Sequence, residues 1–357
     1  MKKIDLDNLG LTGRLSEEAK KYQGHYIGRV SSQAKDLYRV IMEEGELTVE
    51  VSGKFRHLVS TLSDYPVVGD FVLVDRADNS NGNGIIHHVL TRRSCFARKA
   101  AGSNDLQVVA ANIDQVFICM ALNNDFNPRR LERYLSIAWD SGAIPVVVLT
   151  KADLCPDIEA KVDALSPLTV GVDLLITTSM SSDGYAAVQS RIVNGRTVAF
   201  IGSSGVGKST LINRLLGEER LVTHEIRDDD KGRHTTTRRE LILIPEGGVV
   251  VDTPGMRELG IISADLSKSF ADIDELAVNC RFRDCTHGSE PGCAVQQAIK
   301  DGFLSSERLA SFKKLQKEAK YNGLNSKQIE KEKINTMFKG LGGMKNARKF
   351  IKEKSRK

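Results

Sequence analysis

The segment Gly202-Ser203-Ser204-Gly205-Val206-Gly207-Lys208-Ser209 follows the apolar run Thr197–Ile201 and precedes residues 210–216, which are typical of a helix. This order predicts a buried strand, a glycine-rich turn and a helix. Glycines let successive backbone N–H groups point at phosphate oxygens, and the start of the helix adds positive potential. Lys208 can reach the β and γ phosphates of a nucleotide, and Ser209 can ligate Mg²⁺. A chance match of a glycine-rich turn is the competing interpretation, and eight matching positions in this context disfavour it.

A second apolar strand is predicted at residues 248–251, and it runs into Asp252-Thr253-Pro254-Gly255. Asp252 can hold the shell of a Mg²⁺ ion, and the N–H of Gly255 can sense a γ phosphate. The tetrapeptide alone is weak evidence. Together with the phosphate loop it accounts for both ends of one metal site.

A third apolar strand, residues 143–149, ends at Thr150-Lys151-Ala152-Asp153. A carboxylate such as Asp153 can accept hydrogen bonds from N1–H and N2–H₂ of guanine, which adenine does not offer in that arrangement, so it selects GTP over ATP. The stem of Lys151 would lie along the base. A solvated turn at a strand end is the alternative. Thr178 and Ser179, after residues 172–176, are candidates for a further backbone contact to the base.

The base-recognition segment therefore precedes the phosphate loop in the chain, and the Mg²⁺ aspartate follows it. These loops all lie at one edge of a parallel sheet, so moving the chain ends to another surface loop preserves the site. We expect a circularly permuted P-loop GTPase domain with a doubly wound, mainly parallel sheet. The predicted nucleotide-binding residues are Thr150, Lys151, Asp153, Thr178, Ser179, Gly202, Ser203, Ser204, Gly205, Val206, Gly207, Lys208, Ser209, Thr210, Asp252 and Gly255.

Downstream, three cysteines and a histidine occur within fourteen positions: Cys280, Cys285, His287 and Cys293. Three thiolates and an imidazole complete a tetrahedral shell and leave no open position for a substrate, which indicates one structural zinc ion. Disulfides are the competing interpretation. The other three cysteines are scattered and no secretory segment is evident, so we favour zinc.

The first hundred residues contain short β-rich runs separated by turns rich in Gly, Asn and Asp. The spacing predicts a five-stranded barrel of the oligonucleotide-binding (OB) type, although such a barrel can lack a binding function. With 357 residues, 41% hydrophobic and 27% charged, the multi-domain α/β chain can form two or three cores. The expected units are an N-terminal extension (1–20), an RNA-binding barrel (21–100), the permuted GTPase domain (101–265), and a helical zinc-binding domain with a basic tail (266–357).

The net charge of +5 is unevenly distributed. Residues 313–357 contain fifteen Lys or Arg and four Asp or Glu, so the remainder of the chain is net negative. Such a tail fits a phosphate backbone, and a solvated, poorly ordered terminus is an equal alternative. We find no signal peptide and no run of membrane-spanning length, so we expect a cytoplasmic protein without a membrane partner.

The permuted motif order, the segment Gly232-Arg233-His234-Thr235-Thr236-Thr237, the zinc spacing and the leading barrel together resemble the ribosome small-subunit-dependent GTPase A family. The resemblance covers nearly the whole chain and is weakest in the first residues and the far tail. It implies late maturation of the 30S subunit, 16S rRNA as a partner, and GTP hydrolysis to GDP and phosphate stimulated by the ribosomal particle. We expect a monomer.

Met256 stands where many GTPases carry a water-orienting glutamine, so we expect slow intrinsic hydrolysis. By sequence and by the family pattern, His234 is the candidate to position water, and an exposed histidine without that role is the alternative. Thr236 is the predicted switch threonine, which with Ser209 and Asp252 would bind Mg²⁺, while Lys208 stabilises the phosphates. Thr150 replaces a common asparagine, and we expect a weaker link between the base and phosphate loops.

Two hypotheses follow. In the first, the protein is an Mg²⁺-dependent GTP hydrolase that acts as a timing switch on the maturing small subunit. In the second, it is an RNA-binding assembly factor that GTP stabilises in one shape, with incidental turnover.

Overall fold

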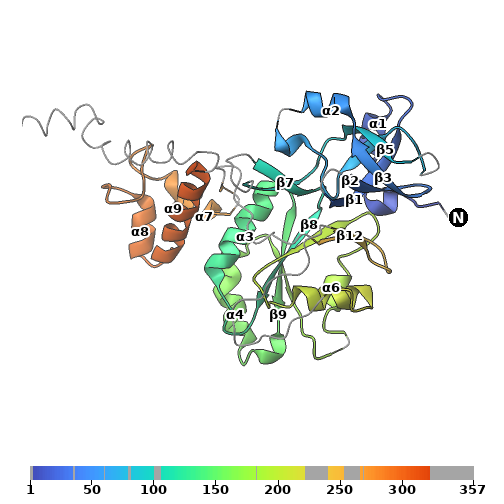
Figure 1. The fold of residues 1–357 in the computed structure, drawn as a ribbon. Coiled ribbons are helices and arrows are strands. Elements are labelled where there is room, and N and C mark those ends of the chain that lie inside the picture. The colour runs from blue at the N-terminus through green and yellow to red at the C-terminus, as the bar shows by residue number, and fades with distance from the viewer. Residues whose placement is uncertain are drawn as a thin grey trace, which may run out of the picture.

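Five strands near the N-terminus close into a barrel (Figure 1). The computed structural model describes residues 3–34, 37–59, 61–78, 82–99, 106–181, 183–221, 240–252, 266–267 and 269–321. The barrel order is β1-β2-β3-β5-β4, with β4 pairing back to β1 and β3 parallel to β5, which is the OB-type arrangement. The strands are β1 (Tyr26–Ala34), β2 (Leu37–Met42), β3 (Gly45–Val51), β4 (Phe71–Val74) and β5 (Gly84–Val89), with helix α2 (Gly53–Leu58) between β3 and β4 in the chain. These strands confirm the predicted barrel.

The barrel is preceded by a short 3-10 helix, η1 (Asp7–Leu9), and helix α1 (Gly13–Ala19). Leu15 and Ala19 of α1 pack against Phe71 and Leu73 of the barrel. A further 3-10 helix, η2 (Leu62–Asp64), precedes the turn into β4. That turn requires a glycine, because Gly69 has φ +93° and an added Cβ would lie 2.2 Å from the carbonyl oxygen of Ala111.

The second part is a parallel sheet in the order β10-β9-β8-β11-β13, with β12 antiparallel at its edge. The side chains of strand β8 show that helices cover both faces of this sheet. Val116 and Ile118 pack in the cluster that contains α3, whereas Phe117 and Cys119 pack in the cluster that contains α6. This alternation confirms the doubly wound architecture.

The elements of this part occur in the following chain order: β8 (Gln115–Ala121), α3 (Pro128–Ser141), β9 (Ile144–Thr150), η3 (Ala152–Leu154), α4 (Ile158–Leu165), η4 (Ser166–Leu168), β10 (Asp173–Ile176), α5 (Ala186–Gln189), β11 (Thr197–Ile201), α6 (Lys208–Leu216), β12 (Glu240–Leu243) and β13 (Val249–Asp252). Asn127 caps α3, its side chain accepting from the N–H of Arg130, and Pro128 occupies the first turn. Asp157 caps α4 in the same way.

The barrel and the parallel sheet are continuous, because β1 pairs with β12 at Ser32 and Glu240. A hairpin of β6 (Cys95–Lys99) and β7 (Leu106–Ala111) connects the two parts in sequence. Arg29 of β1 is fully buried between them. Its guanidinium donates to the carbonyls of Leu9, Gly69 and Asn112 and to the hydroxyl of Thr197 at the start of β11.

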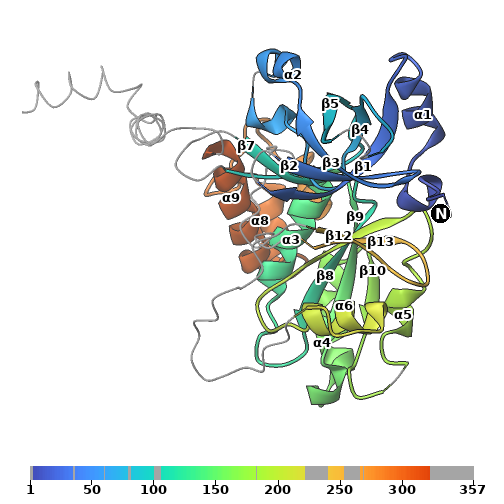
Figure 2. The same cartoon turned by 45° about the vertical axis from the view of Figure 1, so that its right-hand side comes forward.

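The third part consists of helices α7 (Ala271–Ala277), α8 (Ala294–Lys300) and α9 (Ser306–Tyr321). Figure 2 shows these helices beside α3, on the side of the parallel sheet that α3 covers. Phe270 and Phe312 join their apolar residues to the large core cluster. Across the ranges that the structure describes, every helix is too short or too polar to cross a bilayer.

Candidate functional site

The phosphate loop joins β11 to α6, as the sequence predicts. Gly202 has φ +146°, and an added Cβ would lie 2.4 Å from the carbonyl oxygen of Cys119. Gly207 has φ +100° and directly precedes α6. The Nζ atom of Lys208 donates to the carbonyls of Gly202 (2.9 Å) and Ser203 (2.6 Å), so the ammonium lies over the loop. Ser209 and Thr210 lie in the first turn of α6.

Asp252 ends β13, the strand next to β11. Burial raises the pKa of its carboxyl, the facing carboxylate of Glu240 raises it further, and the ammonium of Lys208 opposes them. A largely buried carboxylate beside the phosphate loop is the kind of oxygen ligand that Mg²⁺ binds in proteins, so Asp252 fits the predicted Mg²⁺ site.

The predicted base-recognition segment is linked to the phosphate loop. The hydroxyl of Thr150, buried at the end of β9, donates to the carbonyl of Val206 at 2.6 Å. We expected threonine at this position to weaken the link between the two loops. The hydroxyl nevertheless supplies a direct hydrogen bond, because it lies close enough to the loop to reach it without the longer asparagine side chain.

Asp153 and Thr178 come together although they follow different strands. Parallel pairing of β9 with β10 places their loops side by side, and the Thr178 hydroxyl donates to Asp153 Oδ1 at 2.6 Å. Lys151 adopts a left-handed backbone (φ 58°) immediately before η3. The carbonyl of Ser179 accepts from Arg214 of α6, at 3.2 Å. Thr178 thus orients the carboxylate predicted to read the base, a contact that the sequence did not indicate.

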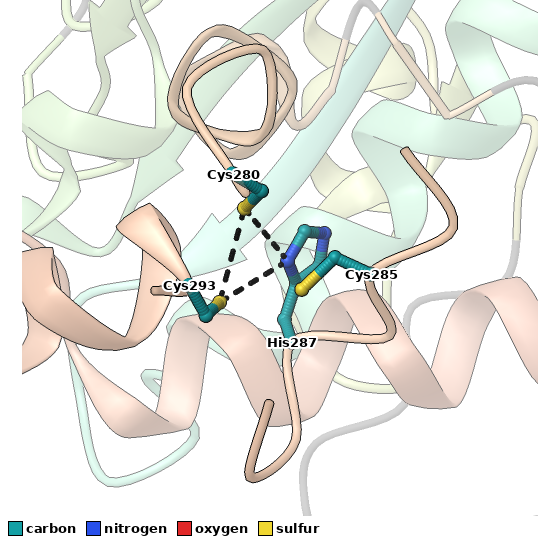
Figure 3. A group of neighbouring side chains, drawn as sticks. All are labelled: Cys280, Cys285, His287 and Cys293. Atoms are coloured by element: carbon teal, nitrogen blue, oxygen red, sulfur yellow. Dashed lines mark hydrogen bonds between the residues drawn. The ribbon is translucent and has the colours of Figure 1, made fainter. Parts of the chain in front are cut away.

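The four predicted zinc ligands converge, and their ligand atoms lie within 4.8 Å of one another (Figure 3). Cys280 Sγ is 3.9 Å from Cys293 Sγ and 3.7 Å from His287 Nδ1, and Cys293 Sγ is 3.5 Å from the same nitrogen. Zinc bonds of about 2.3 Å to sulfur and 2.1 Å to nitrogen give tetrahedral edges of about 3.8 and 3.6 Å. The donor set therefore fits a tetrahedral metal.

The surroundings of the ligands favour metal binding. Cys293 caps α8. Burial opposes ionisation of Cys280, but hydrogen bonds from the backbone N–H groups of Val295 and Ala294 outweigh it, so the pKa of Cys280 lies below the ordinary value. Burial, together with the neighbouring thiols, raises the pKa of Cys285 to about 11, so this thiol needs a metal ion to ionise at neutral pH. Burial and the nearby Lys313 lower the pKa of His287, which keeps the imidazole neutral for ligation.

The loop that carries His287 is held by neighbouring polar groups. The carbonyl of His287 accepts from Gln296 Nε2 (2.7 Å) and from Lys313 Nζ (2.8 Å), which come from α8 and α9. The carboxylate of Glu290 accepts from the N–H groups of Thr286 (3.0 Å) and Gly288 (2.7 Å), on either side of His287. Such contacts orient a metal ligand before the metal arrives.

The most extensive matches to known proteins come from one family. A family model described as RsgA GTPase matches residues 89–262. A small ribosomal subunit biogenesis GTPase, RsgA 2 of Lactiplantibacillus plantarum, is 50% identical over 97% of this chain and 98% of its own length. The chain belongs to the RsgA GTPase family. A second member of the RsgA family, from Methanosarcina acetivorans, is 41% identical over 96% of this chain and 94% of its own length.

Solved structures agree with the RsgA assignment. The fold matches the crystal structure of YjeQ from Thermotoga maritima with a TM-score of 0.62 and 26% identity, over 83% of this chain and 98% of that one. It also matches YloQ, a circularly permuted GTPase, with a TM-score of 0.59 and 25% identity, over 84% and 96% of the two chains. An ABC transporter model matches residues 185–346. That range includes the phosphate loop, which many nucleotide-hydrolysing proteins share, so the match does not indicate a transporter.

Of the residues predicted for GTP hydrolysis in this RsgA protein, His234, Thr236 and Gly255 lie outside the described residues. The structure adds one residue that the sequence did not indicate. Asp125, in the loop after β8, accepts a hydrogen bond from the hydroxyl of Ser203 in the phosphate loop. Its only sequence signal is its position just before the capped start of α3, at Asn127-Pro128.

Proposed function

We propose that this RsgA family member hydrolyses GTP on the small ribosomal subunit while that subunit matures. The observation that carries the proposal is the near-complete overlap with relatives named small ribosomal subunit biogenesis GTPases. The permuted nucleotide site supports the chemistry, because the base, phosphate and metal segments lie at the carboxyl ends of β9, β11 and β13.

In the proposed site, Lys208 and the backbone of residues Gly202 to Ser209 hold the phosphates, and Thr210 extends the first turn of α6. Ser209, Thr236 and Asp252 hold Mg²⁺, which when bound neutralises phosphate charge. Gly255 senses the γ phosphate. His234 positions the attacking water, since Met256 cannot. At the base, Asp153 accepts from guanine, while Thr150, Lys151, Thr178 and Ser179 build the loops around it.

The metal of the cysteine-histidine site is proposed to be zinc, one ion per chain in a structural role. Three thiolates with one imidazole at tetrahedral spacing are the donor set that zinc prefers. Elemental analysis of the purified protein tests this proposal directly.

The proposed RNA partner is 16S rRNA. In support, the barrel carries a group of partly exposed rings: His25 lies 4.8 Å from His87 and 5.9 Å from His88, and Tyr22 lies 4.0 Å from His88. Such rings can stack on unpaired bases. The basic tail beyond residue 321, which would add phosphate contacts, lies outside the described residues.

We further propose a monomer in the cytoplasm, with domains at 1–20, 21–100, 101–265 and 266–357.

The first test measures GTP hydrolysis by the full-length protein with and without purified small ribosomal subunits. We expect slow turnover alone and strong stimulation by the subunits, because the chain lacks the usual water-orienting glutamine. If subunits bind the protein but leave the rate unchanged, the second hypothesis, an RNA-binding factor with incidental turnover, is the better account.

The second test concerns base recognition. Asp153→Asn replaces one acceptor oxygen by an N–H donor, which mismatches guanine but matches the carbonyl of xanthine. We expect GTP affinity to fall by at least about a hundredfold and affinity for xanthosine triphosphate to rise. Asp163→Asn, an exposed residue on α4, is the control. Equal GTP affinity in Asp153→Asn and the control would remove Asp153 from the base site.

A further inference from the structure

A single carboxylate joins the phosphate loop to the start of α3. Asp125 Oδ2 accepts from the Ser203 hydroxyl, and Arg130 donates to both oxygens of Asp125 at 2.8 Å. Burial opposes ionisation of Asp125, but the bonds from Arg130 and Ser203 outweigh it, and the pKa lies below its ordinary value. An ionised side chain therefore contacts a loop whose ligand is itself an anion.

Buried charges also join α3 to the helices around the cysteine-histidine site, α7, α8 and α9, which are called the metal-bearing helices below. Glu132, one turn along α3 and 1% exposed, accepts from Arg129 (2.6 Å) and from Arg308 of α9 (2.9 Å). Arg308 also donates to both oxygens of Asp272 on α7, at 2.9 and 3.0 Å, and to the carbonyl of Ser269. One guanidinium therefore holds α3, α7 and α9 together.

Further contacts join α3 to α9 and hold Arg308 in place. Arg308 is 6% exposed and lies 4.3 Å from the centre of the Phe270 ring, and a second ion pair joins Arg133 of α3 to Glu318 of α9. Separating buried, mutually bonded charges is costly, so a displacement of α3 is transmitted to α7 and α9.

We propose that the nucleotide state of the phosphate loop is transmitted through α3 to the metal-bearing helices, and that Asp125 is the positioning residue that couples the loop to α3. The proposal rests on the proposed GTP site. GTP brings more negative charge to the loop than GDP does, and Asp125 is an anion bonded to that loop. The free energy of the Ser203–Asp125 contact therefore differs between the two nucleotides. This difference shifts the position of α3.

The chain carries its own probe for this proposal. Trp139, the one tryptophan of the sequence, lies near the end of α3. We expect its emission to differ between the protein bound to GDP and to a non-hydrolysable GTP analogue. Asp125→Asn and Ser203→Ala should abolish the difference, and Asp163→Asn on α4 should preserve it.

Binding measurements separate coupling from mere structural support. In Asp125→Asn the ratio of GTP-analogue to GDP affinity should change by about fivefold or more, the lower end of typical coupling. Asp125→Asn and Ser203→Ala should be non-additive in this ratio, since the first removes the charge and the second the donor of the same contact. Asp125→Glu, which keeps the charge, should restore part of the wild-type ratio.

Hydrogen exchange tests the far end of the connection. In the wild type, amides of α7 and α9 should differ in protection between the two nucleotides, and Asp125→Asn should confine the difference to the parallel-sheet domain. Glu318→Gln, which keeps Arg308 in place, should reduce the response of α9 without unfolding it.

The outcomes distinguish this proposal from the proposed function. If the protein does not bind GTP, the proposed function itself is wrong. A protein that binds both nucleotides but shows equal Trp139 emission, or keeps its α7 and α9 response in Asp125→Asn, overturns the α3 connection and leaves the GTP site standing.

Discussion

At the scale of single residues, two hydroxyls orient other groups in the proposed nucleotide site. Thr150 donates to the carbonyl of Val206, and Thr178 donates to the carboxylate of Asp153. Each hydroxyl joins a loop after one strand to a loop after another. The Thr150 contact therefore links the base segment to the phosphate loop, and the Thr178 contact links the loops after β9 and β10.

Thr150→Val removes the hydroxyl and leaves the carbonyl of Val206 without this donor. We expect GTP affinity to fall by about tenfold and the free energy of unfolding to fall by about 1–3 kcal/mol, the cost of an unsatisfied buried polar group. Thr150→Ser, which keeps the hydroxyl, is the control for a titration with labelled nucleotide. If valine and serine variants bind GTP equally, the hydrogen bond does not orient the loop.

At the scale of elements, hydrogen bonds from neighbouring polar groups hold the loop that carries His287 in shape. Glu290 accepts hydrogen bonds from the backbone on both sides of His287. Hydrogen bonds, of which the one from the Thr286 side chain has the largest effect, lower the pKa of Glu290 to about 2. Because the pKa is lowered, the stability that ionised Glu290 gives to the loop is fully present above the ordinary pKa near 4.5. It is lost only as the pH falls toward 2. At neutral pH Glu290 is therefore ionised and keeps its hydrogen bonds to the backbone on both sides of His287.

Glu290→Gln keeps the size of the side chain but removes the charge that the N–H groups bind. We expect metal affinity, measured by competition with a chromogenic chelator at neutral pH, to fall by about 10–100-fold. Glu275→Gln, an exposed acid on α7, controls for loss of charge in the same domain. Indistinguishable affinities in the two variants would show that the loop holds its shape without Glu290.

At the scale of the molecule, one buried arginine joins the barrel to the parallel sheet. Arg29 bonds to groups from the N-terminal segment, the turn before β4, the end of the hairpin and the start of β11. Burial lowers its pKa to about 9, and the carboxylates of Asp114 and Asp70 offset part of that effect. These hydrogen bonds join the barrel to β11, the strand that leads into the phosphate loop.

Arg29→Met fills similar space but leaves several buried oxygens without a donor. We expect a loss of about 3–5 kcal/mol in the free energy of unfolding, as for breaking other buried charge networks. Arg39→Met, on an exposed ion pair with Glu46, should cost less than about 1 kcal/mol. Urea unfolding of both variants checks this, and similar midpoints would contradict the role given to Arg29.

The barrel strands, the strand-loop-helix around Lys208 and the four clustered cysteine and histidine side chains could be predicted from the sequence, whereas the roles of Asp153 and Asp252 stay predictions. Each is encoded over a short stretch, where apolar period and residue spacing dictate local geometry. The pairs of groups that meet became known from the folded structure: Thr150 with Val206, Asp153 with Thr178, Asp125 with Ser203, and Arg308 with Glu132. These partners are distant in sequence and belong to different elements, so no local pattern pairs them. Burial makes the Thr150 and Arg308 contacts specific, because a polar group removed from water must find the partner that the packed helices and strands place within reach.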